Sequence, residues 1–166
     1  SDVCSSDLHR RRDAAAGFRR HVASADATDR VPARRERTRL RHDGAVASRS
    51  ADRIVAFDPA TGVLTAEAGL SLDILCRLFL PRGFFTPVSP GTRFVTLGGM
   101  VAADVHGKNH HREGCFGAHV TGLTLRVADG SIVRCSPTEQ AELFDATIGG
   151  MGLTGHILEV SVRLTR

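Results

Sequence analysis

From Ala51 onward, short apolar stretches alternate with breaks rich in Gly, Pro and Asp, and this alternation restricts the fold more than any other feature. Apolar side chains at every second position are typical of half-buried β-strands. The breaks supply turn residues, and Asp129-Gly130 between two apolar runs is a strong hairpin signal. We therefore expect short strands at residues 53–57, 63–67, 84–88, 120–127, 132–135 and 155–164.

Three other stretches have helical patterns. Ser71 can cap a helix that Pro81 and Gly83 would end. Its apolar side chains recur at helical spacing, at Leu72, Leu75, Cys76 and Phe79. We expect a second helix, rich in Gly and Ala, from Thr96 to about Val105, and a third over residues 138–148, with Thr138 as its cap. A few helices among short strands predict an α+β fold.

The first fifty residues differ from the rest. They contain 12 basic and 7 acidic side chains and show no sustained apolar period, whereas residues 51–166 have a net charge of −1. A solvated basic tail has this composition, and so does GC-rich DNA translated in the wrong frame. We interpret residues 1–8 as adapter-derived and residues 9 to about 40 as partly frame-shifted, with a genuine basic tail as the alternative. The predicted domains are therefore an artefact or disordered segment, 1–50, and a folded unit, 51–166.

Composition excludes several classes of protein. Because the positive charge is confined to the first fifty residues, we expect no nucleic-acid partner. No apolar run approaches the length of a membrane span, and no signal-peptide pattern follows the basic N-terminus. The four cysteines have no C-x-x-C spacing, which favours free thiols in a reducing compartment. We therefore expect a cytoplasmic protein without a membrane span.

The stretch Pro90–His111, PGTRFVTLGGMVAADVHGKNHH, contains the residues best suited to chemistry. Pro90-Gly91 can turn sharply and expose backbone amides. Gly98-Gly99 would let a ligand lie against a helix start, where unpaired N–H groups favour a phosphate. A plain turn and a packing role for the glycine pair remain the alternatives. If both elements bind one pyrophosphate, then Gly91, Thr96, Gly98 and His106 should line one concave surface.

A second cluster follows within the same stretch. His106-Gly107-Lys108-Asn109-His110-His111 places a cation, an amide and three imidazoles within six residues, and Lys108 is the only lysine of the chain. Three histidines could bind a metal, but no Asp, Glu or Cys stands in a familiar ligand pattern with them, so we predict no metal. A solvated charge is the alternative for Lys108.

Taken together, these motifs resemble the second half of the FAD-binding domain of the p-cresol methylhydroxylase and vanillyl-alcohol oxidase superfamily (the PCMH type). They are most similar to the bacterial FAD-linked oxidases of the decaprenylphosphoryl-β-D-ribose oxidase type. The resemblance keeps its order and spacing from Arg53 to the end of the chain. It rests on Pro90–Arg93, Val95–Gly99, His106–His111, Gly114–Gly117, Ala128–Gly130, Glu142–Phe144 with Ala146-Thr147, and Gly149–Gly155.

The resemblance implies FAD as cofactor and assigns residues to it. Gly91 and Thr92 match a turn against the pyrophosphate and ribityl chain. Thr96, Leu97, Gly98 and Gly99 match a loop and helix start around the cofactor. The positions expected beside the isoalloxazine and at the last strand are Ala103, Asp104, Val105, His106 and Ile157. Lys108 falls in the family's substrate-side loop, where a cation could pair with a phosphate or with reduced flavin.

Two departures from the family pattern limit this expectation. No Gly-Arg-Ser-Tyr-Gly-Asp-like phosphate loop precedes Arg53 in this sequence, and we expect the family's substrate-binding domain to be missing from the fragment. We therefore expect part of a FAD-dependent oxidoreductase acting on a sugar CH–OH group, free or lipid-linked, with the fragment itself inactive. A FAD-binding module without oxidase activity and an inactive partial gene product are the alternatives. No catalytic base is assigned; His106 and Lys108 are the candidate catalytic residues, for a flavin-side and a substrate-side role.

Overall fold

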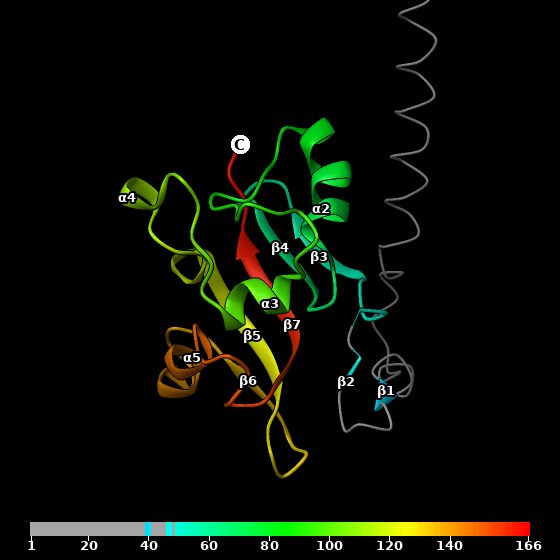
Figure 1. Ribbon diagram of the computed structural model, residues 1–166, viewed down its shortest axis with the longest axis vertical. Coiled ribbons are helices and arrows are strands. Elements are labelled where there is room, and N and C mark those ends of the chain that lie inside the picture. The colour runs from blue at the N-terminus through cyan, green and yellow to red at the C-terminus, as the bar shows by residue number, and fades with distance from the viewer. Residues whose placement is uncertain (1–38, 41–45, 48) are drawn as a thin grey trace, which may run out of the picture.

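The computed structural model describes residues 39–40, 46–47 and 49–166 of the chain (Figure 1). Strands β1 (Arg39–Leu40) and β2 (Val46–Ala47) pair antiparallel. The prediction that the segment before about Ala51 is poorly ordered falls mostly on residues outside those described. It therefore stays a prediction.

The central element is a five-stranded antiparallel sheet with the order β3-β4-β7-β5-β6. The last strand in the chain lies in its middle, between the β3–β4 and β5–β6 hairpins. Five of the six predicted strands are thus confirmed. Their bounds are β3 Ile54–Asp58, β4 Val63–Glu67, β5 Val120–Arg126, β6 Ile132–Cys135 and β7 His156–Arg163.

The strand predicted at residues 84–88 is wrong. Phe85 forms only an isolated bridge with Thr165, through two backbone hydrogen bonds of 2.8 Å. Pro87 has no N–H group, so the ladder cannot continue through it. The apolar alternation nevertheless has a cause, because Phe84, Thr86 and Val88 are buried while the residues between them are only half-buried. Alternating apolar side chains indicate only that every second residue is buried, and an extended segment outside a sheet shows the same pattern.

Helix α2 (Leu72–Phe79) begins and ends as predicted. The Ser71 hydroxyl accepts a hydrogen bond from the Ile74 N–H at 3.3 Å. A short 3-10 turn, η2 (Leu80–Arg82), follows and ends at Gly83, whose φ of 78° suits glycine. In the described part of the chain, no helix combines the length and apolarity that crossing a membrane requires.

The other two predicted helices are shorter than expected. Helix α3 (Leu97–Ala102) has Thr96 as its cap but ends before Val105, because Asp104 takes a left-handed φ of 41°. Helix α5 (Ala141–Thr147) begins after Gln140, and Thr138 does not cap it. Instead, the Ser136 hydroxyl accepts hydrogen bonds from the Thr138 and Glu139 N–H groups and closes a separate turn. Local side-chain-to-backbone bonding has replaced the predicted cap.

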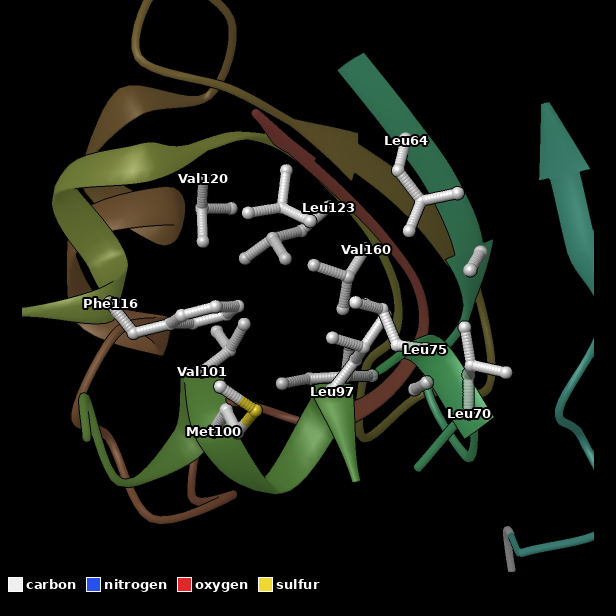
Figure 2. Close-up of a cluster of buried hydrophobic side chains, with 14 of the residues drawn as sticks. Leu64, Leu70, Leu75, Leu97, Met100, Val101, Phe116, Val120, Leu123 and Val160 are labelled. Atoms are coloured by element: carbon white, nitrogen blue, oxygen red, sulfur yellow. The ribbon is translucent and has the colours of Figure 1, made fainter. Parts of the chain in front are cut away.

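The core lies between one face of the sheet and helices α2 and α3. Figure 2 shows Leu97, Met100 and Val101 of α3 directed toward the sheet side chains Val160 and Leu123. These three α3 side chains have no exposed surface. Burying side chains of this size stabilises the fold by about 1.5–3 kcal/mol each relative to exposure. The position of α3 on the sheet is therefore fixed by packing, which in turn fixes the loops at both of its ends.

Candidate functional site

An open hollow of about 790 Å³ lies where two loops meet the end of β7. Residues 85–91 form one loop wall and residues 106–110 the other, with Thr165 between them. None of the described residues that line it carries a carboxylate. Its lining is Phe85, Thr86, Pro87, Ser89, Pro90, Gly91, His106, Gly107, Lys108, Asn109, His110 and Thr165.

The second loop presents the predicted cation and imidazoles. His106 and Lys108 are exposed, while Gly107 between them is buried. His106 forms an isolated β-bridge with Cys115. Its ring lies edge-on to the ring of His110, with 5.5 Å between the two ring centroids. The loop continues into the exposed short helix α4 (His110–Glu113). The structure thus places both catalytic candidates, His106 and Lys108, on one hollow.

Gly91 lies on the same hollow and is open. A Cβ atom added there would meet no atom within 4 Å, and its φ is not in the left-handed region. Neither crowding nor backbone strain explains a glycine at this position, and an approaching ligand would need the space. Thr92 next to it is exposed, and its hydroxyl accepts the Phe94 N–H at 3.3 Å.

The start of α3 is different, and the prediction that it offers unpaired N–H groups is wrong. The Leu97 and Gly98 N–H groups donate to the carbonyls of Leu70 and Ala68, at 2.9 and 2.8 Å. The Gly99 N–H donates to the Thr96 hydroxyl at 3.2 Å. The amides that a phosphate would need are therefore already used within the chain. A direct role for these four residues in binding FAD stays a prediction.

Packing also explains one glycine of the pair. A Cβ atom at Gly98 would lie 2.9 Å from the Ala68 Cβ and 3.2 Å from the Ala68 carbonyl oxygen. Neither Thr96 nor Gly98 lines the hollow, whereas Gly91 and His106 do. The predicted single concave surface is therefore confirmed for Gly91 and His106 only.

Asp104 connects α3 to the 3-10 turn η3 (Phe116–His119). Its carboxylate accepts the Gly117 N–H at 2.8 Å. Gly117 is buried, and a Cβ atom there would lie 2.9 Å from that carboxylate and would also collide with Ile148. This link fixes the direction in which the chain leaves α3 toward His106. Asp104 thus has a structural role that the sequence did not indicate.

The remaining predicted cofactor contacts occupy varied positions. Ala103 is exposed at the end of α3, and Val105 is half-buried, with its carbonyl accepting the Phe116 N–H at 2.9 Å. Ile157 is buried in β7, paired with Leu125. None of these three residues lines the hollow.

Sequence reasoning missed part of the lining. Phe85 and Thr86 fall in the strand predicted at residues 84–88, Thr165 lies one residue beyond the strand predicted at 155–164, and no motif marks the three as site residues. The Asn109 side chain donates to the Pro87 carbonyl at 2.9 Å, which ties the two walls together. The only signal for this contact was the position of Asn109 within the histidine-rich stretch.

Burial shifts the pKa values of some titratable groups outside the hollow. Burial, helped by the nearby charge of Arg126, lowers the pKa of His156. Burial, with a smaller contribution from Asp73, raises the pKa of the Cys76 thiol. The cysteines in the described part of the chain, Cys76, Cys115 and Cys135, are free thiols. Within the same residues, no three His, Cys, Asp or Glu side chains come together in a way that could hold a metal ion.

Comparison with known proteins defines the class of this domain. Residues 37–136 match the FAD binding domain family, so the chain belongs to that family. The fold is the α+β, PCMH-type FAD-binding fold that the sequence motifs predicted, and the cofactor of the family is FAD. The match begins at residue 37, before Ala51. The domain boundary expected at Ala51 stays a prediction.

Individual relatives narrow the class. The chain is 45% identical over 115 residues to a decaprenylphosphoryl-beta-D-ribose oxidase of Mycolicibacterium smegmatis, covering 69% of this chain and 25% of that protein. It is 47% identical over 98 residues to an uncharacterised protein of Streptomyces coelicolor. The crystal structure of 6-hydroxy-D-nicotine oxidase from Arthrobacter nicotinovorans aligns with a TM-score of 0.65 and 25% identity, over 71% of this chain and 26% of that one. The chain thus spans about a quarter of the length of these relatives.

Proposed function

We propose that this chain forms the flavin-side part of a FAD-dependent oxidoreductase that oxidises a CH–OH group of a sugar. The observation that carries the proposal is the hollow, in which an open glycine, an imidazole and the only lysine of the chain face one space without a carboxylate. The similarity to decaprenylphosphoryl-beta-D-ribose oxidase supports a sugar as the substrate class.

The residues of the hollow suit an anionic cofactor and substrate. The open backbone at Gly91 admits a bulky group, and the charge at Lys108 is not opposed by any acidic residue of the lining. FAD, when bound, supplies the acceptor for a hydride from the substrate carbon. We assign to Gly91 and Thr92 the backbone approach to the cofactor. His106 lies on the flavin side, and Lys108 holds negative charge on the substrate side.

The test uses the longer protein that carries this domain, loaded with FAD. A sugar that carries both a free CH–OH group and a phosphodiester should reduce the flavin and bleach its absorbance when oxygen is excluded from the sample. Lys108→Met should leave FAD loading intact and slow that bleaching about tenfold, because one charge-assisted contact is lost.

Arg112→Met is the matched control, because Arg112 is an exposed cation on α4 that does not line the hollow. It should change neither loading nor bleaching. A protein that loads FAD but is bleached by no sugar would be a binding module without oxidase activity. A protein that never loads FAD would contradict the proposal altogether.

A further inference from the structure

The two loops that line the hollow are in contact at one point. The Asn109 amide donates to the Pro87 carbonyl at 2.9 Å. Beside this bond, buried Gly107 packs on Ser89, where an added Cβ atom would lie 2.9 Å from the Ser89 carbonyl oxygen. One side-chain hydrogen bond and one close backbone contact therefore set the separation of the walls.

The use of Asn109 for this bond is unusual for its position. Asn109 directly precedes α4, where an asparagine side chain ordinarily accepts a hydrogen bond from the first turn of the helix. Here the side chain makes no capping bond, and the residue has φ −96° and ψ 11° rather than the extended backbone of a normal cap. The amide is instead directed across the gap to the other wall. The Asn109 side chain therefore links the two loops and does not cap the helix.

In the sequence, Lys108 lies between Gly107 and Asn109, the two residues that make these contacts. Gly107 on one side and Asn109 on the other are held against the first wall, while the Lys108 side chain is exposed to the hollow. A lysine is a flexible point charge, so its usefulness to a ligand depends on where its backbone is held. The geometry points to Asn109 as a positioning residue that holds Lys108 over the hollow to bind an anionic group of the ligand. This inference rests on the proposed function for the presence of such a ligand.

The experiment measures the affinity of the 166-residue chain for inorganic phosphate, followed by the NMR resonance of the Gly91 amide at fixed pH and ionic strength. The variants are Lys108→Met, Asn109→Ala and the two combined. If Asn109 acts through Lys108, its loss matters only while the lysine is present. A residue with a merely structural role would weaken binding independently of Lys108.

We expect Lys108→Met to weaken phosphate binding about tenfold and Asn109→Ala about fivefold, with the double variant close to tenfold. Gly107→Ala would place a Cβ atom 2.7 Å from the Asn109 side-chain oxygen and 2.9 Å from the Ser89 carbonyl oxygen, so it should disturb the same contact and is expected to behave like Asn109→Ala. Asp129→Ala is the matched control, because it removes another loop hydrogen bond, to the Ser131 N–H at 2.8 Å, in the turn between β5 and β6. It should leave phosphate affinity unchanged.

A double variant near fiftyfold, the product of the two single effects, would overturn the inference. So would an Asn109→Ala chain that binds phosphate as tightly as the unchanged protein, or an unchanged chain that binds none. FAD loading is measured separately in the longer protein. Coupled loss of phosphate affinity in a protein that never loads FAD would support the role of Asn109 while rejecting the proposed function.

Discussion

Two glycine-containing regions of one sequence stretch serve different purposes. At the start of α3, Gly98 fits against Ala68, and the first amides of the helix are bonded within the chain. At the hollow, Gly91 has open space around it and lines the same surface as exposed His106 and Lys108. The first region is packed against the rest of the chain and the second is accessible to a ligand. A glycine motif therefore marks a ligand site only where neither crowding nor a positive φ already explains the glycine.

The comparison predicts its largest effect at Gly98. Gly98→Val should lower the free energy of unfolding by about 3 kcal/mol, because the new side chain cannot fit beside Ala68 without displacing backbone. Urea unfolding of the chain would measure this loss. A change below about 0.5 kcal/mol would show that packing does not explain the glycine and would break the comparison.

Asp104 tests whether the exit from α3 is a structural device. Asp104→Ala removes the acceptor of the buried Gly117 N–H and should cost about 2 kcal/mol of stability. Asp104→Asn keeps an acceptor oxygen and tolerates the left-handed φ of 41°, so it should cost less than half as much. Thermal unfolding of both variants would measure the difference. Equal losses would mean that the hydrogen bond to Gly117 is not the source of the effect.

Much of this fold could be predicted because its signals are local. The Asp129-Gly130 hairpin, the Ser71 cap and the apolar periods of α2 and β7 each depend on a few consecutive residues. The errors arise where a distant partner decides the outcome. Residues 84–88 are extended but lie outside the sheet, and Leu70 and Ala68 consume the amides at the start of α3.

In the candidate site too, features set by a few consecutive residues could be predicted and contacts with distant residues could not. His106, Lys108 and Gly91 could be identified from residue type and family resemblance, and the structure brings them to one hollow. The bond from Asn109 to Pro87 spans 22 residues and depends on the folded path of both loops. No local pattern predicts a contact of that kind.

A smaller effect is expected at Thr96, the cap of α3. Thr96→Ala removes the acceptor for the Gly99 N–H and should lower the free energy of unfolding by about 1 kcal/mol. Thr96→Ser keeps the hydroxyl and should be nearly neutral. Urea unfolding separates the two variants. If alanine is also neutral, the Gly99 amide is available for other partners, and the contrast with the hollow weakens.

The smallest effect on stability is expected at Gly91, where the comparison predicts a loss of binding instead. Gly91→Ala should leave the free energy of unfolding within about 0.5 kcal/mol or raise it slightly, because the backbone accepts alanine and the unfolded chain loses freedom. Gly91→Val adds bulk to the same open space and should also unfold normally. In the longer protein, however, valine should reduce FAD retention severalfold by blocking the approach of the cofactor to the backbone. Unfolding curves and the flavin absorbance of purified protein measure the two quantities separately.

A stability loss at Gly91 as large as that at Gly98 would mean that both glycines serve packing. Unchanged FAD retention with valine would place the cofactor away from this wall of the hollow.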